Sequence, residues 1–128
     1  MLGVVFSTFA APDKPDSSAK IHALLEARRD VLKQRSEAVE TQMKHGLLND
    51  FGSLIAARND LLGAELALAS TKDERIALLK KHVANCLEYE KFNQGRFEAG
   101  RGATQVDVLS STAARLEAEI ALAREEAA

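Results

Sequence analysis

Apolar side chains recur every three or four residues along most of this chain, which is the spacing of one face of an α-helix. Residues 17–45 carry such a pattern without a proline or a glycine. Further patterns of the same kind cover residues 51–68, 72–99 and 105–128. The chain is therefore predicted to be all-α, with four long helices.

Residues that favour helix ends stand at the borders of these four patterns. Asp16–Ser18, Asp50 and Thr104 are good N-caps for the first, second and fourth helices. Thr71, followed three residues later by Glu74, predicts a capping box at the start of the third helix. Short connections between such helices predict two antiparallel helical hairpins in tandem.

The two halves of the chain align without a gap when one is shifted by 54 residues. A repeat of this length usually means that one supersecondary unit is used twice. Here the unit is a helical hairpin, so both hairpin tips should lie at the same end of the molecule. Glycine suits the left-handed position that ends a helix, and one occurs at each tip. Matching pairs include Gly46 with Gly100, Asp50 with Thr104, Leu62 with Leu116, and Glu65–Ala69 with Glu119–Ala123.

The fourth helix carries two neighbouring stripes instead of one. Its first stripe steps alternately by four and three residues, as in a coiled-coil seam. Two stripes suit a helix with two neighbours in an open array, whereas one broad apolar face suits a closed bundle. Both arrangements stay open, with the coiled-coil-like bundle slightly favoured. That first stripe consists of Leu109, Ala113, Leu116, Ile120 and Ala123.

Composition agrees with a single helical domain. The chain has 128 residues, of which 46% are hydrophobic and only 5% aromatic. The net charge of −2 gives no indication of a nucleic-acid-binding surface. A single cysteine, Cys86, excludes an intrachain disulfide and is expected to be a buried thiol.

No arrangement of residues predicts a catalytic, cofactor or metal site. His22, His45 and His82 are scattered, and no Glu-x-x-His pair accompanies them. Phosphate-binding loops and nucleophile motifs are also missing from the sequence. The chain is therefore expected not to be an enzyme and to need no cofactor.

Two glutamates stand at matching positions in otherwise apolar segments. They are Glu65 and Glu119, and each has an arginine nearby in the sequence, Arg58 and Arg115 respectively. The simplest expectation is an ion pair within each helix.

The first sixteen residues differ from the rest. Met1–Ala11 is apolar and ends in small residues, and Pro12 and Pro15 follow it. We expect residues 1–16 to be a signal-peptide remnant or a disordered linker, and residues 17–128 to form the duplicated α-hairpin domain. A signal remnant would place the protein in the periplasm or at the outer membrane, with the cytoplasm as the alternative. Met1–Ala11 is too short to span a membrane, and no transmembrane span is expected.

The second tip resembles the hairpin tips of the TolC-type outer-membrane efflux proteins. Its sequence from Ala99 to Leu109 reads AGRGATQVDVL, and the Ala- and Leu-rich run Leu116–Ala123 follows. The first tip, Gly46–Ile55, is similar but has Ser53 at the position of Asp107. The resemblance covers roughly residues 19–128 and only the periplasmic hairpin portion of such proteins. The short connection near Thr71 leaves no room for the β-strands that the family inserts there.

This resemblance implies a non-enzymatic envelope protein, related to efflux or transport, that acts through helix–helix contacts at its tips. Its partners would be another protein docked on the tips or further copies of the chain. The alternative is a stand-alone soluble four-helix bundle that acts as a small-ligand-binding or chaperone-like module. For the tip residues, helix capping alone is the competing interpretation of Asp50, Thr104 and Asp107. The implied partner-binding residues are Gly46, Asp50, Gly100, Thr104, Asp107, Val108 and Leu109.

Overall fold

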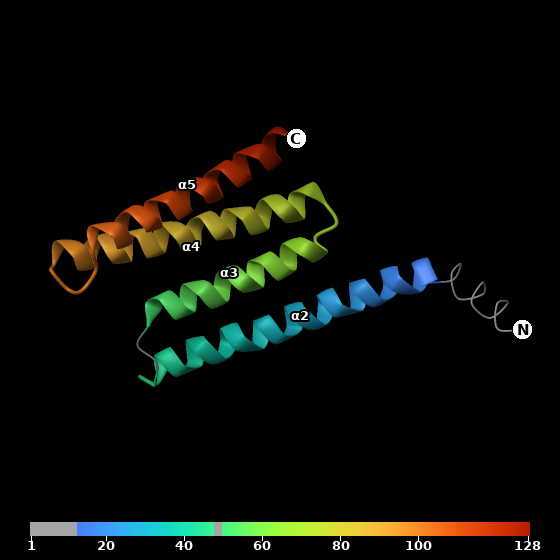
Figure 1. Cartoon of the computed structure of the whole chain (residues 1–128), viewed down its shortest axis with the longest axis horizontal. Helices are drawn as coiled ribbons and strands as arrows, with labels where there is room; N and C mark the ends of the chain where they lie inside the picture. Colours follow the sequence, from blue (N-terminus) through green and yellow to red (C-terminus); the bar gives the residue numbers. More distant parts are fainter. Residues whose placement is uncertain (1–12, 48–49) are drawn as a thin grey trace, which may run out of the picture.

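The computed structural model describes residues 13–47 and 50–128. Within that part of the chain the fold is all-α, with four helices and no strand, so the predicted fold class is confirmed. The helices, labelled in Figure 1, are α2 (Asp13–Lys44), α3 (Phe51–Leu68), α4 (Lys72–Glu98) and α5 (Gln105–Ala127).

The first helix starts earlier than the sequence predicts. It begins at Asp13, so residues 13–16 of the expected linker are helical. Pro15 lies in the first turn, where its missing N–H has no helical partner to lose. The predicted signal remnant lies within residues 1–12, outside the described part of the chain.

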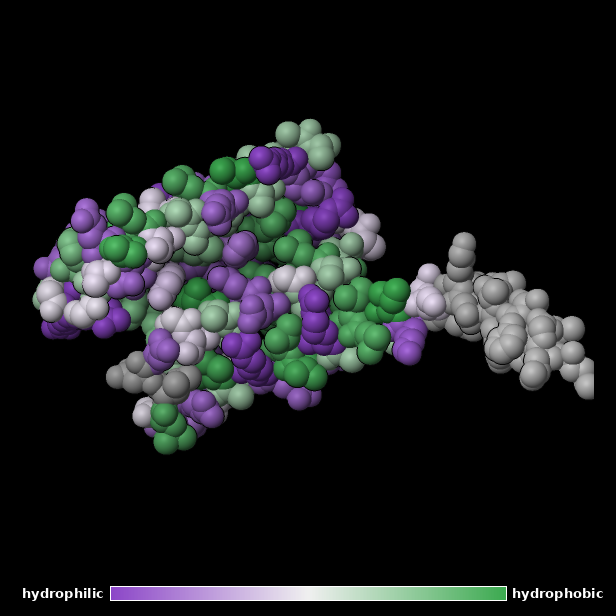
Figure 2. Space-filling view, in the orientation of Figure 1, coloured by the Kyte–Doolittle hydropathy of each residue, from purple (hydrophilic) through white to green (hydrophobic). Residues whose placement is uncertain are grey.

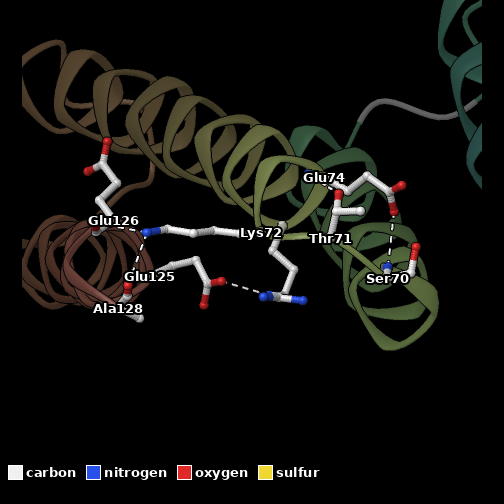
Figure 3. Close-up of polar contacts among 8 residues, drawn as sticks. Ser70, Thr71, Lys72, Glu74, Glu125, Glu126 and Ala128 are labelled. Atoms are coloured by element: carbon white, nitrogen blue, oxygen red, sulfur yellow. Dashed lines mark hydrogen bonds and ion pairs between the residues drawn. The ribbon is translucent and has the colours of Figure 1, made fainter.

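The three other helices begin at the predicted N-caps. Asp50, Thr71 and Thr104 each accept a hydrogen bond from a backbone N–H in the first turn of the helix that follows. The capping box predicted for Thr71 is only half formed. Glu74 accepts instead from the N–H of Ser70, the residue before the cap, at 3.1 Å (Figure 3).

Each helix packs mainly on its neighbours in the sequence. Contacts join α2 to α3, α3 to α4, and α4 to α5. Figure 1 shows α2 and α5 at opposite edges of the molecule, with α3 and α4 between them. The described helices therefore form an open array of two hairpins, and the slightly favoured closed bundle is not what the chain adopts.

The open array follows from the two apolar sides of α3. Helical geometry places Ala57 and Ala64 on one side of α3 and Ile55 and Leu62 on the opposite side. All four residues are buried, so neighbours cover both sides of this helix. A central helix with two covered faces keeps α2 and α4 apart, and the array cannot close around a single core.

Ion pairs fix how neighbouring helices align. Arg58 of α3 contacts Glu40 of α2 at 3.1 Å and Glu88 of α4 at 3.5 Å. Arg115 of α5 contacts the largely buried Glu90 of α4 at 2.6 Å. The bond from Arg115 lowers the pKa of Glu90, because it stabilises the charged carboxylate. Exposed pairs of this kind add little stability, about 0–1 kcal/mol, but they favour one register.

The end of α5 is tied to the start of α4. Lys72 donates through Nζ to the backbone carbonyls of Glu126, at 3.4 Å, and Ala128, at 3.1 Å (Figure 3). Arg75 forms an ion pair with Glu125 at 2.7 Å. A cation at the carbonyl end of a helix also interacts favourably with the helix dipole. These contacts hold the end of the second hairpin that lies opposite its tip.

Much apolar surface stays in contact with solvent. Figure 2 shows hydrophobic side chains scattered among hydrophilic ones over the face drawn. In the described residues, no helix combines the length and the apolar character that crossing a membrane would require.

Candidate functional site at the hairpin tips

Both hairpin tips lie at the same end of the molecule, as the sequence predicts. Figure 1 places the loops around Gly46 and Gly100 at one end and the turn at Thr71 at the other. The candidate partner-binding residues are thus brought to one end.

Each tip begins with the same helix-ending motif. Gly46 has φ +71° and Gly100 has φ +69°, a conformation that residues with a side chain rarely adopt. The N–H of Arg101 donates to the carbonyl of Arg96 at 2.7 Å, and the N–H of Gly100 donates to that of Phe97 at 3.1 Å. These two bonds form a Schellman motif. The same pair of bonds closes the first hairpin's long helix at Gly46.

Asp50 caps α3 and is fully committed to that task. Its carboxylate accepts from the backbone N–H of Gly52 at 3.0 Å and from Oγ of Ser53 at 2.7 Å. The bond from the Ser53 hydroxyl is the main reason that the pKa of Asp50 lies below its ordinary value. Ser53 is the residue at the position of Asp107 in the first tip, and here it supports the cap.

Thr104 and Asp107 form a complete capping box. Thr104 Oγ1 accepts from the N–H of Asp107 at 3.2 Å, and the Asp107 carboxylate accepts from the N–H of Thr104 at 2.8 Å. This backbone bond is the main reason that the pKa of Asp107 is lowered. The sequence indicated the cap but not the reciprocal bond, because the usual N3 residue of a capping box is Glu or Gln.

The most exposed large apolar residues sit at the tips. Leu47 is 79% exposed and Val106 is 71% exposed, the two highest values among the described large hydrophobic residues. Leu109, one of the predicted contact residues, is also exposed, whereas Val108 is half-buried. The exposed apolar surface of the tips therefore consists of Leu47, Val106 and Leu109, while the capping residues hold the first turns of α3 and α5.

The sequence did not predict an aromatic cluster that lies between the tips. Phe51 packs against Phe92, with ring centroids 4.7 Å apart, and against Tyr89 at 6.2 Å. A side chain at Gly52 would meet the Tyr89 hydroxyl at 3.1 Å, so glycine permits this close approach. The signal was present as aromatic residues spaced three apart in α4, but nothing in the sequence showed that α3 would supply Phe51.

Arg96 joins this cluster to the second loop. The Arg96 guanidinium lies 5.4 Å from the centre of the Phe92 ring and donates to the carbonyl of Arg101 at 2.7 Å. Its charge also helps to lower the pKa of both Asp50 and Asp107. A groove of about 370 Å³ lies between the two tips, lined by Asp50, Phe51, Phe92, Arg96 and Arg101.

The expected ion pairs of the two matching glutamates have different outcomes. Arg115 contacts Glu119 at 3.0 Å, as predicted. The prediction that Arg58 pairs with Glu65 is wrong, because Arg58 instead contacts glutamates on both neighbouring helices. Glu65 lines a groove of about 270 Å³ between α3 and α4, together with Lys81. Helix α3 has two neighbours that compete for its arginine, a condition that the sequence alone did not reveal.

The other candidate chemistry is sparse. Cys86 is buried, as predicted, and burial raises the pKa of its thiol. His22 lies 3.5 Å from Glu26, one turn along α2. Across residues 13–47 and 50–128, no three His, Cys, Asp or Glu residues gather in a way that could hold a metal ion.

Comparison of the chain with protein-family models, with curated proteins and with solved structures finds no match.

Proposed function

We propose that this chain is a non-enzymatic helical-hairpin protein that binds a partner protein through its two tips. The observation that carries the proposal is the exposure of Leu47 and Val106 at the same end of the array. Apolar side chains exposed at the end of a hairpin suit a contact whose centre is apolar. The partner surface would be an apolar groove or helix face that accepts both tips.

The helix ends beside these side chains are held by local hydrogen bonds. A Schellman motif ends the helix before each tip, and a capped helix begins after it. Contact residues on preorganised helix ends lose little conformational freedom when they bind, which favours affinity. Asp50, Thr104 and Asp107 thus serve binding indirectly, by holding the helix ends next to the contact residues.

We further infer that the two hairpins are two copies of one unit. The left-handed glycines Gly46 and Gly100 and the N-caps Asp50 and Thr104 are both 54 residues apart. Buried small residues repeat with the same shift. These are Ala57 with Ser111 and Ala64 with Ala118.

The resemblance of the second tip to TolC-type proteins extends the proposal to the cell envelope. By that resemblance, the partner is a component of an efflux or transport assembly, and the protein acts in the periplasm or at the outer membrane. Support for this extension consists of the tip sequence from Ala99 to Leu109 and the placement of both tips at one end. Gly100, Asp107, Val108 and Leu109 are the residues that carry the likeness.

A second candidate, a small-ligand-binding or chaperone-like module, has one supporting observation. The groove between α3 and α4 is mainly apolar and holds about 270 Å³. Leu61, Leu62 and Ala84 line it, and Arg58, Glu65 and Lys81 add charge. A ligand bound there would not involve the tips, so the two candidates predict contacts on different surfaces.

Site-specific photo-cross-linking tests the tip proposal. A photoreactive residue at Val106 or Leu47, introduced into the full chain in cells that naturally express it, should yield one adduct of defined mass. The same residue at Lys80, an exposed position on α4 away from both tips, is the matched control.

Two substitutions complete the test. Each substitution is combined with the probe at the other tip: Leu47→Ser should weaken or abolish the adduct formed from position 106, and Val106→Ser the adduct formed from position 47. Helicity and melting temperature should stay unchanged, because both side chains are already exposed. Equal adducts at Lys80 and at the tips, or adducts that survive both substitutions, would rule the proposal out.

A further inference from the structure

The side of α5 that faces away from α4 carries a regular row of exposed apolar residues. Helical geometry places this row opposite the buried Ser111 and Ala118. Its members step by four and three residues in turn, the spacing of a coiled-coil seam. We call it the α5 outer row; it consists of Leu109, Ala113, Leu116, Ile120 and Ala123, all exposed.

The other edge of the array has a matching row. Along α2, exposed residues step by three and four in turn over the same length of helix. Leu24 and Val31 are its large members and are 59% and 62% exposed. We call it the α2 outer row; it consists of Leu24, Ala27, Val31, Gln34 and Ala38.

A shift of 54 residues maps both rows onto residues of the contact between α3 and α4. It maps Leu109 and Leu116 onto Ile55 and Leu62 of α3, which are buried. It maps the α2 outer row onto residues of α4 that include Asn85, which donates to Asn59 of α3 at 3.3 Å. The outer row of α5 is therefore the counterpart of the face of α3 that packs on α4. The outer row of α2 is the counterpart of the face of α4 that packs on α3.

We propose that the α5 outer row of one copy packs on the α2 outer row of a second copy, as α3 packs on α4. This inference rests on the two-unit proposal above but is independent of docking at the tips. In the new contact, Val31 and Ala113 would replace the Asn85–Asn59 pair. Gln34 and Thr112 would replace Glu88 and Arg58, so the contact buries no ion pair.

The charges of the two edges are complementary. Helix α5 carries five acidic and two basic side chains. Helix α2 as a whole is nearly neutral, with seven basic and six acidic side chains, but its stretch from Lys20 to Arg35 carries five basic and two acidic ones. Opposite charge along two helices that meet through apolar rows speeds their encounter and disfavours pairing of α5 with another α5. A second copy offering α2 is therefore the occupant that the α5 edge fits.

The contact joins two different surfaces, so it is heterologous. A pair of copies still has one free α2 outer row and one free α5 outer row. Such contacts continue until a ring closes or a filament grows. The average mass in solution should therefore rise above that of a dimer as protein concentration increases.

Disulfide cross-linking of mixed single-cysteine variants tests this pairing directly. In a Cys86→Ala background, Val31→Cys and Ala113→Cys proteins should form a mixed disulfide when combined under mild oxidation. Neither variant alone should cross-link efficiently, and Lys80→Cys is the control for random collision. Efficient cross-linking of Ala113→Cys with itself would show a twofold α5–α5 contact and overturn the proposal.

Sedimentation of the full chain provides the second measurement. Leu116→Glu or Val31→Glu should weaken self-association by about tenfold or more, because each places a charge in the apolar contact. Lys80→Glu should leave it unchanged, and so should the tip variant Leu47→Ser, which separates this proposal from tip docking. A wild-type chain that stays monomeric at high concentration would overturn the pairing.

Discussion

At the scale of single residues, the tips owe their shape to local hydrogen bonds that serve as helix caps. Asp107 shows this best, because its carboxylate and the Thr104 hydroxyl each satisfy a backbone N–H of the other residue. The ionised carboxylate accepts both bonds that Thr104 offers more strongly than the neutral acid would. Its lowered pKa is the consequence.

The Asp107 cap makes the stability of the chain depend on pH. Because the folded-state pKa lies below the unfolded one, the cap contributes fully above the ordinary aspartate pKa and is lost as pH falls through the lowered value. Asp107→Asn should lower the melting temperature at neutral pH, with a gap to wild type that narrows in acid. Thermal melts at a series of pH values check this, and a gap that stays constant down to strongly acidic pH would contradict it.

Residue-level chemistry was also the most predictable part of the chain. The caps Asp50, Thr71 and Thr104 and the helix-ending Gly46 and Gly100 were all recognisable, because each acts within a few residues of its partner. The contacts of Phe51, Arg58 and Glu65 were not, since they depend on which helix lies alongside. A single sequence shows which face of a helix is apolar but not which neighbour covers it.

At the scale of helices and turns, the two long helices, α2 and α4, end with the same glycine-containing motif. Gly100 and Gly46 adopt left-handed conformations with no neighbouring atom near the place of a side chain. A substitution there therefore acts on the backbone conformation alone. Gly95, inside α4, also has open space around it but keeps an ordinary helical backbone.

These glycines predict opposite effects for the same substitution. Gly100→Ala should destabilise the chain by about 1–2 kcal/mol, because a side chain is strained at positive φ. Gly95→Ala should stabilise it by roughly 0.5–1 kcal/mol, because alanine favours the helix interior. Urea unfolding of both variants measures the two values, and destabilisation of similar size in both would refute the assigned role of Gly100.

The two stripes predicted for the fourth helix indicated that a short helix could have two neighbours, but the sequence could not decide between an open array and a closed bundle. In α3 both sides are buried, whereas in α5 the side that carries Leu109 and Leu116 is exposed. The two helices have nearly the same pattern and differ only in their place within the array. That difference arises only when the helices pack together. The sequence therefore did not reveal that an open array forms instead of the slightly favoured closed bundle.

At the scale of the whole molecule, the proposed pairing of copies depends on the open arrangement of the four helices. A closed bundle would cover the outer rows of α2 and α5 and leave no edge for a second copy. The open array instead exposes Leu24, Val31, Leu116 and Ile120 at its two edges and Leu47 and Val106 at its tips. Both kinds of surface are directed outward, which is typical of a protein that works by assembly.

The distance between α2 and α5 tests this openness most directly. Spin labels at Gln34 and Ala123, both exposed, can be measured by pulsed electron paramagnetic resonance in a Cys86→Ala background diluted with unlabelled protein. Adjacent helices lie about 8–10 Å apart, and two helices separate α2 from α5. We predict a mean distance above about 25 Å; a distribution centred below about 20 Å, as for adjacent helices in a closed bundle, would contradict the open array and with it the proposed pairing of the α5 and α2 outer rows.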